Sequence, residues 1–173
     1  MTYPQAYLQY LVHFHGNRDY FECHEVLEEY WKEVDPGNRS SHWVGLIQIA
    51  VGLYHYRRDN VHGAERILSK ALCNLKDNQP ALDGLGLDSS SLIRTLDKTI
   101  SNIGEQVPYN SLDLPIKDPA LLNEAEDLCR KEGYTWCMPS DLSNEQLIHR
   151  HSMRDRTPVI DERLKALNKK RLT

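Results

Sequence analysis

Residues 14–53 read FHGNRDYFECHEVLEEYWKEVDPGNRSSHWVGLIQIAVGL and predict two helices joined by a short turn. In residues 18–34 the apolar side chains recur every three or four positions, which is typical of a helix with one buried face. The following Asp35-Pro36-Gly37-Asn38 predicts a turn. A helix over residues 41–57 would have apolar residues on almost every side. A helix that is apolar all round is expected at the centre of a fold, covered by its neighbours.

Further helices are expected on both sides of this pair. The helix over 18–34 and the one predicted after Asn60 align at an offset of 41 residues, which places Asp19 with Asn60 and Leu27 with Leu68. Such self-similarity is typical of successive helical hairpins, and short connections make each pair antiparallel. We therefore predict an all-α fold of tandem antiparallel helical hairpins, loosely similar to tetratricopeptide pairs. The other predicted helices cover residues 4–15, 61–77, 88–103 and 119–131.

The second half of the chain is less regular. We expect a loop over 82–87 and an extended segment over 107–116, where two prolines favour a segment lying on the bundle over a central strand. Thr157-Pro158 is expected to open a basic C-terminal helix. These patterns divide the chain into a helical bundle domain, residues 1–104, and an irregular and helical C-terminal extension, residues 105–173, packed on the same domain.

The amino-acid composition limits the class of protein to which this chain can belong. With 40% hydrophobic and 27% charged residues, neither a disordered nor a membrane protein is favoured. The longest apolar run, 45–56, is too short to span a bilayer, and the N-terminus has no secretory pattern, so we expect a cytoplasmic protein. The net charge of −4 gives no general attraction to nucleic acid. Four cysteines without CxxC spacing are expected to be buried thiols: Cys23, Cys73, Cys129 and Cys137.

The charge is concentrated at one end. From Gln146 onward there are eight basic and three acidic residues. A solvated charged terminus is the common explanation, and contact with phosphate is a second one. A third is that this segment folds back onto the acidic face of the 18–34 helix, in the same or a second subunit.

His24, Glu25 and Glu28 are the strongest candidates for a site. His24 and Glu28 lie four residues apart on a helix, at the rim of the apolar face, and are close enough to pair or to share a ligand. Zinc favours His nitrogen and carboxylate oxygen, and the next helix could supply His55 and Gln48. His13 and His15 are further candidates. The ordinary alternative is a hydrogen-bonded His24–Glu28 pair that only fixes helix packing.

Two glycines on the 41–57 helix add to this region. Gly45 and Gly52 lie seven residues apart, on the same side as Gln48 and His55. Glycine is costly inside a helix, so another backbone or a ligand should approach closely there. A tight helix crossing is the favoured explanation, and a ligand is the other.

The stretches FHGNRDYFECHEVLEEYW, GLIQIAVGLYHY and NVHGAERILSKAL resemble a prokaryotic family of small helical proteins catalogued as a domain of unknown function. The shared pattern is a His-Glu-x-x-Glu-x-x-Trp helix followed by a Gly-Leu-Ile-Gln helix, and it covers about residues 10–76. The resemblance implies a helical bundle without a known task. The positions it singles out are His24, Glu25, Glu28, Trp31, Gly45, Gln48 and His55.

We expect a non-catalytic module that binds a small ligand or a protein in a groove lined by His, Glu and Trp, with Trp31, Gln48, Gly45 and Gly52 as binding residues. The alternative is a metal-dependent hydrolase with a divalent metal held by His24, Glu28 and His55, and Glu25 as general base. A homodimer is a further option for the partner. Nucleic acid and membrane are not expected as partners.

Overall fold

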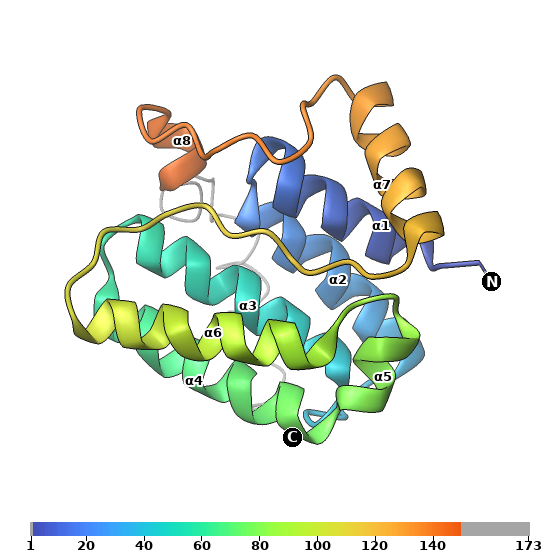
Figure 1. The fold of residues 1–173 in the computed structure, drawn as a ribbon, viewed down its shortest axis with the longest axis horizontal. Coiled ribbons are helices and arrows are strands. Elements are labelled where there is room, and N and C mark those ends of the chain that lie inside the picture. The colour runs from blue at the N-terminus through green and yellow to red at the C-terminus, as the bar shows by residue number, and fades with distance from the viewer. Residues whose placement is uncertain (1, 150–173) are drawn as a thin grey trace, which may run out of the picture.

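The computed structural model describes residues 2–149, and their regular structure is helical. Within these residues the only strand-like pairing is an isolated antiparallel bridge between Leu87 and Ile116. The prediction of an all-α fold is therefore confirmed (Figure 1). The elements are α1 (Gln5–Val12), the π-helix η1 (His13–Asn17), α2 (Tyr20–Val34), α3 (His42–Arg57), α4 (Val61–Asp77), α5 (Gln79–Gly84), α6 (Ser89–Gly104), α7 (Pro119–Lys131) and α8 (Glu145–Ile148).

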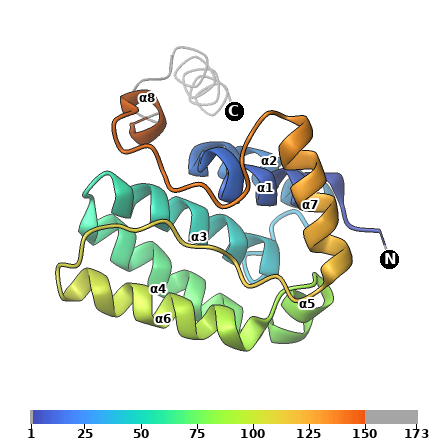
Figure 2. The same ribbon diagram turned by 45° about the horizontal axis from the view of Figure 1, so that its top comes forward.

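The centre of the fold is α3, which packs against α2 on one side and α4 on the other (Figures 1 and 2). Most of its side chains are buried, as its all-round apolar sequence predicts. The two flanking helices begin in the same way: Asp19 accepts a hydrogen bond from the Glu22 N–H, and Asn60 accepts one from the Gly63 N–H. These N-caps satisfy amide donors that have no partner within the helix. The predicted 41-residue repeat of helix starts is present in the structure.

Glycines let α3 and α4 approach closely. A Cβ atom added to Gly45 would lie 2.2 Å from the Asn74 Oδ1, and one added to Gly52 would lie 2.4 Å from the Leu68 Cδ2. Asn74 and Leu68 both belong to α4. The tight helix crossing, the favoured explanation of these glycines, is therefore confirmed.

Replacing Gly52 by alanine should lower the free energy of unfolding by about 1–3 kcal/mol, because the fully buried Leu68 must move to admit the new methyl group. Urea denaturation measures the loss. Gly104, in the last turn of α6, is the matched control, because no atom lies within 4 Å of an added Cβ. The unfolding free energy of the Gly104→Ala variant should be unchanged or slightly higher. Equal effects of the two substitutions would contradict the packing argument.

Two predicted boundaries are corrected. The loop expected over residues 82–87 is wrong in its first part, because α5 extends to Gly84. Pro80 lies in the first turn of α5, where a missing N–H costs little, so this proline helps to start a helix. The first helix changes at Val12 into η1, and Arg18 then ends the turn with a left-handed backbone, φ 56°.

Residues 105–118, the strap, cross the bundle in an extended conformation (Figures 1 and 2). Backbone bonds hold its far end: the Asp88 N–H donates to the Pro115 carbonyl over 2.9 Å, and the Lys117 N–H donates to the Gly86 carbonyl over 2.8 Å. The strap thus lies on the bundle, as its two prolines predict. The domain boundary at residue 104 stays a prediction, and the helix predicted from Thr157 lies outside the described residues.

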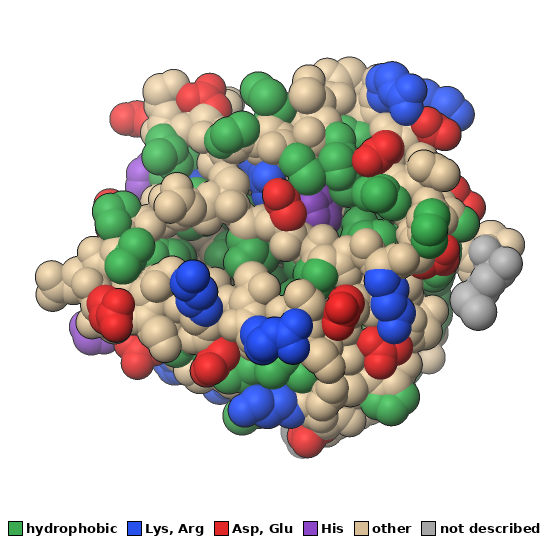
Figure 3. All heavy atoms as spheres, in the orientation of Figure 1, with side chains coloured by type: hydrophobic (Ala, Val, Ile, Leu, Met, Phe, Trp, Pro, Cys, Tyr) green, Lys and Arg blue, Asp and Glu red, His purple; other side chains and the backbone are tan. Residues whose placement is uncertain are grey.

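Figure 3 shows which kinds of side chain lie on the face that the strap crosses. Hydrophobic side chains are frequent along the strap, and charged side chains are frequent over α6 and at the outer end of α7. No helix among residues 2–149 is long and apolar enough to cross a membrane.

The cysteines differ in environment. Cys23 and Cys129 are buried, as predicted, and burial raises the pKa of both thiols. Cys73 and Cys137 are exposed, so the prediction is wrong for these two. Cys73 lies on the outer side of α4, away from the apolar positions Leu68, Ala71 and Leu75.

Candidate functional site

α2 separates apolar and acidic side chains. Tyr20, Cys23 and Leu27 are buried, whereas the remaining surface of the helix carries five glutamates and only one lysine. Val34, the last residue of the helix, is half exposed. The glutamates are Glu22, Glu25, Glu28, Glu29 and Glu33.

α3 runs antiparallel to α2, so the start of α2 faces the end of α3. The Arg57 guanidinium lies 4.5 Å from the centre of the Tyr20 ring. At the opposite end, the rings of Tyr30 and Trp43 meet edge to face at 5.1 Å. These two contacts fix the register of the helix pair.

A cavity of about 300 Å³ opens between these two helices, and we call it the α2–α3 groove. Its aromatic and aliphatic walls come from Phe21 on α2 and from Val51 and Tyr54 on α3. The Phe21 and Tyr54 rings are 6.5 Å apart. Polar groups border the same space. The complete lining is Tyr20, Phe21, His24, Glu25, Val51, Tyr54, His55 and Arg58.

His24 lies between two carboxylates. Its Nε2 is 2.6 Å from the Glu28 Oε2, and its Nδ1 is 3.2 Å from the Glu25 Oε1. Lys32 then pairs with the other Glu28 oxygen over 3.1 Å. The predicted pairing of His24 and Glu28 is therefore present, and it belongs to a chain of interacting polar side chains along the surface of α2.

His55 reaches the groove from α3, so the structure brings His24 and His55 to one cavity, as predicted. The His55 Nδ1 is 3.2 Å from the Asn60 Nδ2, which ties the ring to the start of α4. Gln48 and Glu28 do not line the groove. The Gln48 Oε1 is buried without a hydrogen-bond partner among the described residues.

The other predicted binding residues also lie away from the groove. Gly45 and Gly52 face α4, as the crossing described above requires. Trp31 is partly buried, and its indole N–H donates to the Asn38 carbonyl in the turn after α2 over 3.1 Å. Trp31 thus closes the α2–α3 turn, and its role in binding stays a prediction.

Metal binding gains no support from the geometry. Among residues 2–149, no group of three or more His, Cys, Asp or Glu side chains could hold a metal ion. In the present arrangement both ring nitrogens of His24 face carboxylate oxygens, and His55 contacts an amide. The predicted ligand set of His24, Glu28 and His55, with Glu25 as base, stays a prediction.

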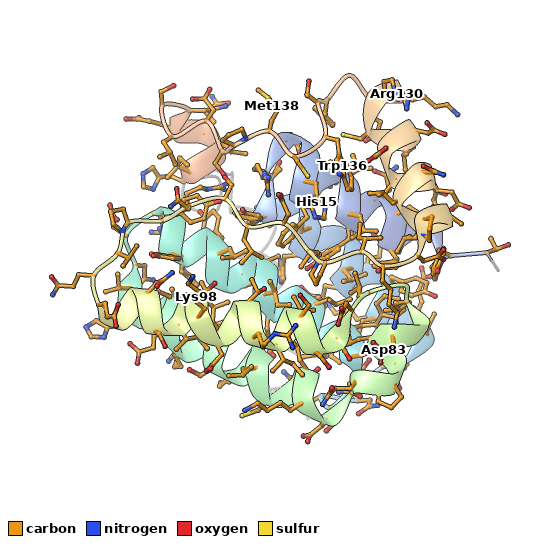
Figure 4. All side chains as sticks on the ribbon, viewed as in Figure 1. His15, Asp83, Lys98, Arg130, Trp136 and Met138 are labelled. Atoms are coloured by element: carbon orange, nitrogen blue, oxygen red, sulfur yellow. The ribbon has the colours of Figure 1, made fainter. Side chains whose placement is uncertain are left out.

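The two histidines before α2 lie outside the groove. The His13 Nδ1 is 3.2 Å from the Asn17 Oδ1. His15 is buried and stacks on Trp136, with ring centres 4.4 Å apart (Figure 4). The His15 Nδ1 donates to the Leu11 carbonyl, and its Nε2 accepts from the Leu114 N–H. His15 therefore joins α1 to the strap.

Most of the groove's apolar wall and its arginine were not predicted from the sequence. Phe21, Val51, Tyr54 and Arg58 were not among the predicted binding residues. The register of the hairpin could have revealed them. A short turn makes the helices antiparallel, and residues on α2 and α3 whose numbers sum to about 75 then face each other, as Phe21 and Tyr54 do.

The chain is similar to known proteins over most of its length. A family model described as "Domain of unknown function (DUF309)" matches residues 7–67, a range that includes both walls of the groove. The uncharacterized protein YpuF of Bacillus subtilis (strain 168) is 48% identical over 169 residues, covering 98% of this chain and 97% of that protein. No solved structure matches. The extent of the YpuF match and the family model together show that the chain belongs to the DUF309 family.

Proposed function

We propose that the protein is a non-catalytic binding module whose α2–α3 groove takes a basic, partly apolar peptide segment. The observation that carries this proposal is the lining of the groove. Aromatic and aliphatic side chains form its walls, and the most acidic helix of the described chain forms one side.

The size and walls of the groove fit side chains of a peptide. A cavity of about 300 Å³ lies at the small end of the range for ligand sites. It has room for one or two side chains, which fits a peptide laid across it better than a large cofactor. Phe21, Val51 and Tyr54 offer the apolar contact area.

The charges favour a basic ligand. Glu25 borders the groove, and Glu28 lies one turn further along α2. A lysine or arginine of the ligand could pair with these carboxylates while its aliphatic stem covers the Phe21 ring. Arg58 already lies 5.5 Å from the centre of the Tyr54 ring, and it offers a donor for a peptide carbonyl at the opposite wall.

A synthetic peptide of about 18 residues, with leucine and lysine at helical spacing, tests this function. Titrated into the 173-residue chain, it should shift the amide NMR signals of residues 20–28 and 51–58. Glu25→Lys should weaken binding about tenfold, because one attractive contact becomes repulsive.

Glu33→Lys is the matched control. Glu33 lies on the same helix and is exposed but does not line the groove, so its reversal should change affinity by less than about twofold. Signal shifts that map to other helices, or equal losses for Glu25→Lys and Glu33→Lys, would refute the proposed site.

A further inference from the structure

The charge of this chain changes sign at the end of the described residues. Of the 21 basic and 25 acidic residues, 8 and 3 lie in residues 150–173, which leaves 13 and 22 in residues 1–149. We call residues 150–173 the tail. A basic tail and an acidic body attract each other, most strongly where glutamates are dense. Among the helices of the body, α2 has that density.

The tail begins beside the groove. α8 ends at Ile148, which is buried, and the preceding Leu147 carbonyl accepts a hydrogen bond from the Arg57 Nη2 over 3.2 Å. Arg57 is the last residue of α3, and its guanidinium covers the Tyr20 ring, which also lines the groove. Figures 1 and 2 show α8 beside this end of α3. The chain therefore enters the tail next to the α3 end of the α2–α3 groove.

The tail is long enough to follow the groove. Its 24 residues would span about 36 Å as a helix, whereas the 15 residues of α2 span about 22 Å. No long linker is needed, because the starting point is already at the site. A binding segment that starts this close to its site has an effective concentration on the order of millimolar.

The tail sequence matches the chemistry of the groove. Ile160, Leu164 and Leu167 recur at i, i+4 and i+7, which is the anchor pattern of an amphipathic helix that lies in an apolar groove. Arg163 and Lys165 flank the central leucine. The leucines suit the wall formed by Phe21, Val51 and Tyr54, and the cations suit the carboxylates of α2.

We propose that the tail is the groove's own ligand: residues 150–173 dock intramolecularly across α2 and α3, with apolar side chains in the groove and basic ones on the glutamates of α2. This inference rests on the proposed function, because it assigns an occupant to the same site. An outside basic peptide must then displace the tail to bind.

Zero-length carbodiimide cross-linking of the full chain tests the contact directly, because it joins a lysine to a carboxylate only where they touch. Lys165, Lys169 and Lys170 should be joined to Glu25 and Glu28 within single chains, and rarely to Asp97 on α6. The yield should fall at about 0.5 M salt, because exposed ion pairs are screened. Cross-links spread evenly over all helices, or found only in covalent dimers, would overturn an intramolecular contact.

Competition separates this inference from the proposed function. The triple variant Lys165→Gln, Lys169→Gln, Lys170→Gln should bind the leucine–lysine peptide about tenfold more tightly than the natural chain, because its competing tail is weakened. Lys70→Gln, Lys76→Gln, Lys98→Gln removes the same charge from the body and is the control. Equal affinities of the tail variant and the natural chain would overturn the inference alone. Failure of both proteins to bind the peptide would overturn the proposed function and the inference with it.

Discussion

Replacing Arg18 by alanine should lower the free energy of unfolding by about 3–5 kcal/mol. Its side chain is only 2% exposed, and its guanidinium bonds to three separate parts of the chain. The Nε donates to the Met138 carbonyl over 2.6 Å, and the Nη1 donates to the carbonyls of Leu112, over 2.7 Å, and Phe14, over 3.2 Å. The Nη2 pairs with Asp113 over 2.7 Å.

The expected loss of stability is large because the alanine would leave several hydrogen-bond acceptors without their donor. Hydrogen bonds from a charged donor contribute about 1.5–3 kcal/mol each, and a buried acceptor left unpaired costs its full desolvation. The strap and the segment around Met138 would both lose a bond to the turn before α2. Since the alanine keeps the left-handed backbone at residue 18, the variant removes the side-chain contacts without relieving that strain.

Two variants separate the contribution of the Arg18 hydrogen bonds from that of its charge. Guanidinium denaturation measures the unfolding free energy of each. Arg18→Lys keeps a cation but has no planar fork, so it should lose most of the stability that the alanine variant loses. Asp113→Asn tests the ion pair alone and should cost about 1 kcal/mol or less, because Asp113 is 53% exposed. An alanine variant within about 1 kcal/mol of the natural chain would show that the strap is held elsewhere.

The helices could be predicted from the sequence because their evidence is local. The periodic apolar side chains of α2 and the all-round apolar character of α3 each depend on a few neighbouring residues. The 41-residue repeat added a longer-range observation, and the structure contains it. The short helix α5 was missed because Pro80 closely follows the end of α4, and a proline after one helix can also start the next.

The two buried arginines could not be predicted in the same way. Arg18 and Arg57 are buried cations whose partners lie up to 120 residues away, and charged side chains are expected on the surface. The sequence held one indication that Arg57 is buried, since it follows Leu53 by one turn on a helix with almost no polar side. Its Nη1 donates to the Arg18 carbonyl over 2.6 Å, so the two arginines are connected.

The candidate site could be predicted only in part. His24, Glu28 and His55 were identified because their residue types are uncommon on the rim of an apolar face, and the structure places His24 and His55 at one cavity. Gln48 and the two glycines were grouped with them from the helical wheel of α3. A wheel gives the side of a helix but not the neighbour on that side, and here α4 covers the glycines.

Lowering the pH should destabilise the protein through His15. Burial lowers the pKa of His15 to about 4, whereas an unfolded chain has a histidine pKa of about 6.5. The contribution of neutral His15 is therefore complete above pH 6.5 and is lost as the pH falls toward 4. The two values correspond to about 3 kcal/mol in total, of which about 2 kcal/mol is lost by pH 5.

The structural reason is that both ring nitrogens are already used. Nδ1 is the donor to the Leu11 carbonyl, and Nε2 must be unprotonated to accept the Leu114 N–H over 2.9 Å. A proton on Nε2 would place two N–H donors, that of His15 and that of Leu114, against each other. The His15 side chain is 1% exposed and lies beside the cationic Arg18. The strap would then lose the hydrogen bond that joins Leu114 to His15.

His15→Gln isolates this effect from the other seven histidines and from the carboxylates. Glutamine has a donor and an acceptor but does not titrate, so the variant is expected to be less stable at pH 7 and to lose less stability on acidification. The difference in unfolding free energy between the two proteins should shrink by about 2 kcal/mol from pH 7 to pH 5. His62→Gln, at an exposed position on α4, is the matched control for the exchange of a histidine for a glutamine. Parallel profiles for the natural chain and His15→Gln would mean that His15 takes up its proton without disturbing the strap.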